Sequence, residues 1–155
     1  MNFKSIFTVG SVFFVVGAFT STIIYARGNE LLSSSGSETV TRVVDGDTYE
    51  IEAPWSKYPL KWKVRVRGID TPEKGHRAGC EREQMLGAQA SALAYKLISQ
   101  SGREIVLRNV DHDKYGGRLL ADVYLIDGTP LIEPMLDKRL AQRYDGDGPK
   151  PNWCN

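Results

Sequence analysis

The sequence contains few of the residues that build zinc sites, with 2 cysteines and 2 histidines among 155 residues. A zinc site needs clustered Cys or His ligands, and Cys80, Cys154, His76 and His112 show no such spacing. The two cysteines fit an exported protein with one disulfide, and two free thiols are the alternative. We therefore exclude a structural zinc module and leave a Cys80–Cys154 disulfide as a possibility.

The sequence also lacks an excess of positive charge, since 20 Lys and Arg stand against 19 Asp and Glu. The segment up to Arg27 holds Lys4 and Arg27 and no acid, so subtracting these two cations leaves 18 against 19 acids in residues 28–155. A passive nucleic-acid-binding module usually carries a clear basic excess. Any polyanion must therefore meet a local cationic patch or a bound metal ion.

One long apolar run is present, from Ile6 to Ala26. A run of about 21 residues can span a bilayer as one helix, and a secretory signal is the alternative. Ala26 is a poor cleavage site, so we favour an uncleaved anchor. We expect residues 1–27 to be a membrane anchor or signal segment, and the Ser- and Gly-rich residues 28–38 to be a flexible linker. The domain at 39–155 is then membrane-anchored outside the cytoplasm, or secreted or periplasmic.

The pattern after the linker predicts five strands and two helices. The expected strands are 39–44, 48–51, 61–69, 104–110 and 118–125, and the expected helices are 81–99 and 131–144. The third strand alternates an apolar face, Trp62, Val64 and Val66, with a cationic face. Five short strands with a helix between the third and fourth indicate a five-stranded OB-fold barrel with two or three packed helices, in the α+β class.

Three charged clusters fall at strand ends or in adjacent turns. They are Asp45-Gly46-Asp47-Thr48, then Arg65 with Asp70-Thr71-Pro72-Glu73, and Asp113-Lys114-Tyr115-Gly116-Gly117-Arg118. Each cluster alone is equally a turn with solvated charges. Together they offer carboxylates for a hard cation and arginines for phosphate oxygens. A ligand set of oxygens only fits Ca²⁺ better than Zn²⁺ or copper.

These three ordered motifs, with Leu140-Ala141 after them, resemble the thermonuclease (staphylococcal nuclease-like) family over about residues 39–144. The resemblance implies an exported Ca²⁺-dependent nuclease that hydrolyses DNA, RNA or both, is sugar-nonspecific and leaves 3′-phosphate ends. A non-catalytic OB-fold nucleic-acid-binding module is the alternative. The expected partners are a nucleic acid substrate and, if residues 6–26 are uncleaved, a membrane, and we expect a monomer.

The resemblance also implies roles for the acids. Asp47 and Asp70 match carboxylates that bind Ca²⁺, with the backbone carbonyl of Thr71 as a further ligand. Glu73 matches the acid that positions or deprotonates the attacking water. Asp45 matches an acid near the metal that is not a principal ligand.

The cationic and aromatic residues have implied roles as well. Arg65 and Arg118 match two arginines that hold the phosphate and stabilise the transition state. Lys114 and Tyr115 match positions that contact a neighbouring phosphate of the substrate. The sequence departs from the family pattern at Gly117, which is an additional glycine before Arg118.

Overall fold

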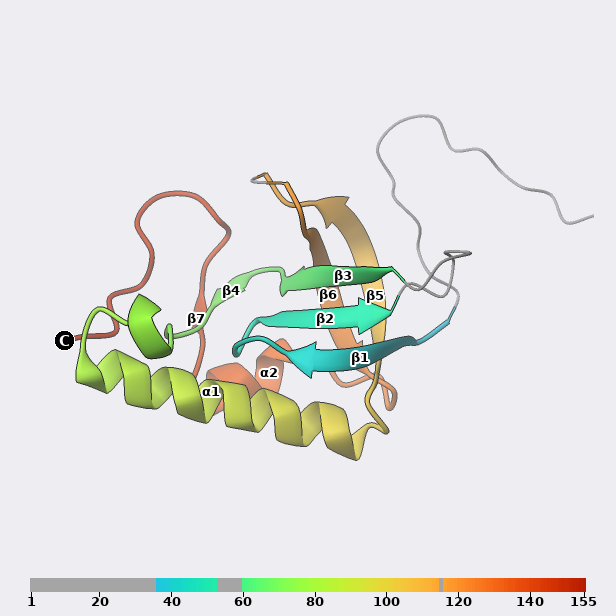
Figure 1. Ribbon diagram of the computed structural model, residues 1–155, viewed down its shortest axis with the longest axis horizontal. Helices are drawn as coiled ribbons and strands as arrows, with labels where there is room; N and C mark the ends of the chain where they lie inside the picture. Colours follow the sequence, from blue (N-terminus) through green and yellow to red (C-terminus); the bar gives the residue numbers. More distant parts are fainter. Residues whose placement is uncertain (1–35, 53–59, 115) are drawn as a thin grey trace, which may run out of the picture.

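The computed structural model describes residues 36–52, 60–114 and 116–155, and its main strands close into a barrel (Figure 1). The barrel strands are β1 (Glu38–Val43), β2 (Thr48–Glu52), β3 (Lys61–Val66), β5 (Glu104–His112) and β6 (Leu119–Leu125). They follow the order β1-β2-β3-β6-β5, with β3 and β6 parallel and β1 and β5 antiparallel. The predicted five-stranded OB-fold barrel is therefore confirmed, and β1 begins one residue before the expected start of the domain.

The expected anchor at residues 6–26 and most of the expected linker lie outside the described residues. Among the residues that the structure does describe, no helix is long and apolar enough to cross a membrane.

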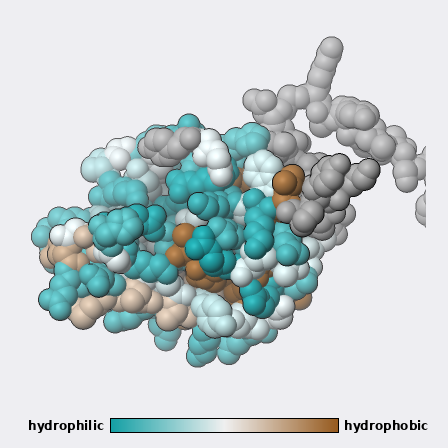
Figure 2. Space-filling model, viewed as in Figure 1, coloured by the Kyte–Doolittle hydropathy of each residue, from teal (hydrophilic) through white to brown (hydrophobic). Residues whose placement is uncertain are grey.

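The barrel core follows from the alternation of apolar residues along the strands. Every second residue of β6 is buried, and the same pattern brings inward-facing side chains from the neighbouring strands. The core includes Tyr49, Ile51, Val64, Val66, Ile105, Leu107, Leu119, Ala121 and Val123. The outer face is charged, and Figure 2 shows a mostly hydrophilic surface with small, separated hydrophobic patches.

The cations of β3 have acidic partners across the sheet. Lys61 lies opposite Glu52 and Lys63 lies opposite Glu50 on β2. Opposite charges in such cross-strand pairs favour the register of the hairpin. The outward lysines of β3 therefore face acids, and they do not form a free cationic row beside the barrel.

The third strand is shorter than the sequence predicts. We expected one strand over 61–69, but β3 ends at Val66 and a separate strand, β4 (Ile69–Asp70), follows. Gly68 lies between them with φ +80°, a conformation that glycine adopts at little cost. β4 leaves the barrel and pairs with β7 (Gln142–Arg143), which directs the acidic turn after Asp70 to one side of the barrel.

A long helix, α1 (Glu81–Gln100), packs along the barrel (Figure 1). Glu81 and Glu83 in its first turn complement the positive end of the helix dipole. Its buried residues are Gly87, Ala90, Ser91, Ala94 and Ile98. The leucines at 86, 93 and 97 are only partly buried, because the small residues lie closest to the barrel.

The small residues of α1 allow two segments to approach its backbone closely. A Cβ atom added at Gly87 would lie 2.7 Å from the carbonyl oxygen of Pro72 and closer still to that of Glu73. On the hairpin, a Cβ atom added at Gly46 would lie 2.8 Å from Ala90 and 2.9 Å from Thr71. Distances this short exclude any larger residue without movement of the backbone, so α1 fixes the relative positions of the hairpin and the acidic turn.

The prediction of a second helix over 131–144 is wrong beyond its first turns. The structure has a short helix, α2 (Ile132–Asp137), and residues 142–143 form β7 instead. Arg139 adopts φ +57°, which ends the helical path, and the chain then pairs with β4. The basic loop after Glu73 contains a 3₁₀ turn, η1 (Gly75–Arg77).

The C-terminal segment, residues 144–155, returns to the start of α1 (Figure 1). Cys154 forms a disulfide with Cys80, the N-cap residue of α1, across 74 positions of sequence. Trp153 beside it is buried, with 6 % of its surface exposed. The end of the chain is therefore anchored to the helix that supports the acidic turn.

Replacement of Gly87 by alanine tests this close approach. In an unconstrained helix the change would stabilise by about 1 kcal/mol, because alanine has the higher helix propensity. Here the added methyl group meets backbone carbonyls, so we expect the free energy of unfolding to fall by about 2 kcal/mol. Urea denaturation measures the difference. Ala88→Gly on the exposed face is the control for propensity, and a stabilised Gly87→Ala protein would contradict the packing.

Candidate active site

The β1–β2 hairpin places two acids at one end of the barrel. Asp45 and Asp47 are both buried, with 7 % and 5 % of their surface exposed. One oxygen of Asp47, Oδ2, accepts hydrogen bonds from the backbone N–H of Thr71 at 2.8 Å and from its hydroxyl at 2.9 Å. The hydroxyl of Tyr49 donates to the Gly46 carbonyl at 2.7 Å and holds the turn. The hairpin and the β4 segment are thus joined through Asp47 and Thr71.

Asp70 lies at the end of β4 and is almost completely buried. Its Oδ1 atom lies 3.2 Å from Nη2 of Arg65 and 3.0 Å from Nζ of Lys150. Its Oδ2 atom accepts from the indole N–H of Trp153 at 3.4 Å. Both oxygens of Asp70 therefore have donors, and two of these donors come from the C-terminal segment.

Arg65 bridges the two buried aspartates. Its side chain is 11 % exposed, and it forms ion pairs with Asp47 through Nη1 and with Asp70 through Nη2. A planar guanidinium suits this role because its N–H groups point in fixed directions. The bridge brings together two acids that are 23 positions apart in the sequence.

Glu73 is the most accessible acid of the group. Its side chain is 29 % exposed, and it pairs with Arg77 at 3.1 Å and with Lys150 at 3.3 Å. The backbone N–H of Glu73 donates to the Glu83 carboxylate of α1 at 3.3 Å. This hydrogen bond fixes the backbone position from which the Glu73 side chain extends. Arg77 also reaches Asp45 at 2.8 Å, so it connects Glu73 to the hairpin.

Burial and neighbouring charges shift the pKa values of Asp47 and Lys150. Burial raises the pKa of Asp47 to about 6, with Asp45 and Asp70 adding to the rise and Arg65 and Thr71 opposing it. Burial tends to lower the pKa of Lys150, but the hydrogen bond to Asp70 and the charges of Asp70 and Glu73 outweigh it and raise that pKa. Lys150 is therefore a cation at neutral pH.

A cleft of about 920 Å³ lies beside this cluster, and Asp70 is not among the residues that line it. Asp45, Asp47, Arg65 and Glu73 line one part of it, and Arg118 lines another. The cleft is also lined by the end of β5, by the loop between β5 and β6, and by residues 144–147 near the C-terminus. Arg65 and Arg118, which are far apart in the sequence, thus face the same space.

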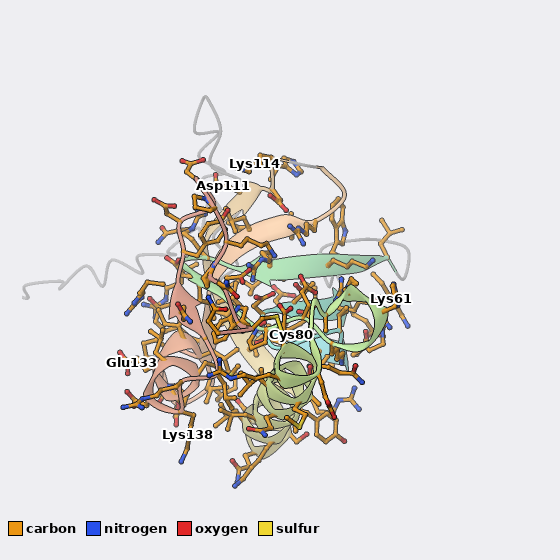
Figure 3. All side chains as sticks on the ribbon, turned by 90° about the vertical axis from the view of Figure 1, so that its left-hand side faces the viewer. Lys61, Cys80, Asp111, Lys114, Glu133 and Lys138 are labelled. Carbon is orange, nitrogen blue, oxygen red and sulfur yellow. A yellow bond between two sulfur atoms is a disulfide. The ribbon has the colours of Figure 1, made fainter. Side chains whose placement is uncertain are left out.

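The β5–β6 loop contributes the remaining residues that the sequence singled out. Arg118 pairs with Asp113, and its side chain is 33 % exposed. The ammonium group of Lys114 donates to the Gly146 carbonyl at 2.5 Å and lies 3.5 Å from Asp147. Figure 3 shows Lys114 and Asp111 together at the top of this view, well away from Glu133 and Lys138. Tyr115 lies outside the described residues.

The acids of this cluster are oxygen donors, the chemical type that suits a hard divalent cation, but among the described residues no three of their carboxylates bring oxygens within 4.8 Å of one another. Asp47, Asp70 and Glu73 offer carboxylate oxygens, and two cationic side chains, Arg65 and Lys150, already contact those oxygens. Oxygen ligands of this kind are those that Ca²⁺ prefers. Thr71 is buried beside them, and its amide and hydroxyl both bind Asp47.

Sequence reasoning missed three residues of the site: Arg77, Lys150 and Trp153. All three lie outside the three clusters of charged residues that the sequence singled out. The one available signal was the pair of cysteines, since a bond from Cys154 to Cys80 brings the tail close to the acidic turn.

The fold and the site together are a closed five-stranded barrel with buried acids and two arginines on one cleft. The sequence profile of the family described as staphylococcal nuclease homologue matches residues 63–152, which is more than half of the chain. The chain belongs to this family, which confirms the resemblance noted in the sequence. The match includes Arg65, Asp70, Glu73 and Arg118, whereas Asp47 precedes it.

One relative is similar to part of this chain. The protein described as "Probable staphylococcal-like nuclease CAN1" from Oryza sativa subsp. japonica is 32% identical over 91 residues. The alignment covers 59% of this chain and 24% of the relative, so the match spans about a quarter of that protein.

Replacement of Arg65 by methionine tests the bridge between the buried aspartates. Removal of one partner leaves uncompensated buried charge, so we expect the free energy of unfolding to fall by about 3 kcal/mol. Urea denaturation in the presence of a chelator measures the loss. Arg42→Met is the matched control, because Arg42 pairs with Glu50 on the surface and its loss should change stability little. Equal effects of the two substitutions would argue against the bridge.

Proposed function

We propose that this domain is a Ca²⁺-dependent nuclease that hydrolyses the phosphodiester bonds of DNA, RNA or both. The observation that carries the proposal is that the accessible Glu73, the buried Asp45 and Asp47 and two arginines line one cleft. Asp70 is buried beside this cleft and is paired with Arg65. Membership of the staphylococcal nuclease homologue family supports a role in nucleic acid cleavage or binding.

The proposed roles follow from burial and from the cleft. Asp47 and Asp70, together with Thr71, would hold the cation, which supplies positive charge to a phosphate oxygen. Glu73 is accessible to water and is the proposed acceptor of the proton from the attacking water. Arg65 and Arg118 line the cleft and would donate to the phosphate oxygens as negative charge builds there.

The substrate preference follows from the kind of contacts available. Arginine and lysine side chains recognise phosphate groups, and such contacts carry no sequence information. Lys114 lines the same cleft and is the proposed contact for a neighbouring phosphate, together with Tyr115. We therefore expect cleavage with little preference for sequence or sugar. The resemblance to the thermonuclease family is what implies 3′-phosphate products.

We also propose that the domain acts outside the cytoplasm, either anchored through residues 6–26 or released. The disulfide between Cys80 and Cys154 supports this proposal, because disulfides persist mainly in oxidising compartments. Cell fractionation and sequencing of the mature N-terminus would test it.

Replacement of Glu73 by glutamine tests the proton acceptor. The change keeps the size of the side chain but removes its basicity, so we expect kcat to fall roughly 100- to 1,000-fold. Release of acid-soluble fragments from single-stranded DNA measures the rate. Glu133→Gln, on the exposed surface of α2, is the matched control. Unchanged cleavage by the Glu73→Gln protein would remove Glu73 from the mechanism.

Removal of the cation gives a separate test. We expect a chelator to stop cleavage by the purified full chain and added Ca²⁺ to restore it, because cation ligation is part of the proposed site. Gel analysis of single-stranded DNA and RNA follows both steps. A chain that binds these polymers but cleaves neither, with Ca²⁺ present, would instead be the non-catalytic binding module.

A further inference from the structure

The C-terminal segment crosses the candidate site and is held on both sides of it. Before the crossing, β7 pairs with β4, and the backbone N–H of Tyr144 donates to the Gly68 carbonyl at 3.1 Å. After the crossing, Trp153 is buried and Cys154 is bonded to Cys80. The intervening residues therefore have both ends fixed beside the cleft.

Lys150 extends from this segment into the acid cluster. Its Nζ atom lies 3.0 Å from Oδ1 of Asp70 and 3.3 Å from Oε1 of Glu73. Asp70 is a proposed ligand of the cation and Glu73 is the proposed proton acceptor. Lys150 therefore occupies the space between the two acids on which the proposed function depends.

We propose that Lys150 is a tethered counter-ion that competes with the divalent cation for Asp70 and Glu73 and so sets the cation concentration at which the site fills. This inference rests on the proposed cation site. It concerns the affinity of that site and adds no step to the cleavage reaction.

The hydrogen bonds of Asp70 explain why the two cations compete. A carboxylate oxygen has about two acceptor positions. Oδ1 of Asp70 already contacts both Arg65 and Lys150, and Oδ2 contacts Trp153. A divalent cation that binds Oδ1 must therefore displace at least one of the two side chains.

Lys150 is the side chain that leaves more easily. Arg65 is 11 % exposed and also bound to Asp47, whereas the side chain of Lys150 is 55 % exposed. The ammonium group of Lys150 sits on a flexible chain of methylene groups and can return to water at low cost. The cation thus replaces Lys150 and leaves Arg65 in the site.

The anchors keep the competitor close. When Lys150 leaves the acids, the β4–β7 pairing and the disulfide still hold its backbone beside the cleft. Tethering makes its return intramolecular, with an effective concentration set by the length of the connection. The anchors therefore make one exposed ammonium group an effective competitor.

Calorimetric titration of the purified full chain with CaCl₂ tests the inference. We expect Lys150→Met to lower the Kd for Ca²⁺ by roughly 1.5- to fivefold, the range for loss of a partly exposed ion pair. Lys150→Arg keeps the charge and should stay close to wild type. Lys138→Met removes one exposed charge at the end of α2, from a residue that does not line the cleft, and should leave the Kd unchanged.

The disulfide gives a second, independent test. A Cys80→Ser/Cys154→Ser protein, shown to be folded by near-ultraviolet circular dichroism, should also bind Ca²⁺ more tightly. Adding Lys150→Met to it should produce little further change, because both alterations remove the same competitor. If the Cys80→Ser/Cys154→Ser protein does not fold, the Kd values of Lys150→Met and Lys150→Arg for Ca²⁺ are sufficient to test the inference.

The outcomes separate this inference from the proposed function. Wild-type Ca²⁺ binding with an equal or weaker affinity in Lys150→Met would overturn the inference and leave the cation site intact. Absence of Ca²⁺ binding in wild type and every variant would overturn both.

Discussion

The structure depends on holding four carboxylates together at one end of the barrel. Like charges at such short range repel, and burial of the aspartates adds a desolvation cost. Three cations offset this, and each bridges two acids, giving an alternating series of Asp47, Arg65, Asp70, Lys150, Glu73, Arg77 and Asp45. The first and last acids belong to the same hairpin. The series therefore connects the hairpin, β3, the acidic turn and the C-terminal segment into one electrostatic unit.

This arrangement requires that the backbone beneath the acids be fixed, and α1 provides that support. Gly87 lets the backbone of Glu73 approach the helix, and Ala90 receives the tip of the hairpin at Gly46. Glu83 binds the N–H of Glu73, and Cys80 ties the helix to the end of the chain. Small residues on one helix face thus bring together acids that arise from separate parts of the sequence.

The sequence could predict the parts of the site that are local or follow simple periodicity. Alternation predicted the third barrel strand, and the cluster at residues 45–48 was expected beside a strand end, where the β1–β2 hairpin carries Asp47. It could not predict that the chain leaves its helix after Asp137, because pairing of residues 142–143 with β4 is a tertiary contact. For the same reason it could not place Lys150, whose position depends on that pairing and on the disulfide. The sequence also could not show that the small residues of α1 are buried more deeply than its leucines, because leucine is the more apolar residue.

The C-terminal segment contacts the cleft at two places, at the acids and at Lys114. Its contacting groups resemble a cation at the acids and a phosphate at Lys114. At the acids, the ammonium group of Lys150 takes a position that suits a cation; at Lys114, the Gly146 carbonyl and Asp147 present oxygens, as a phosphate would. The two contacts differ in strength, because Asp147 is 91 % exposed whereas Asp70 is 3 % exposed. A charge pair weakens as the surrounding dielectric constant rises, so the contact at Lys114 is the weaker one. The segment should therefore separate first from Lys114, while Lys150 is still paired with the acids.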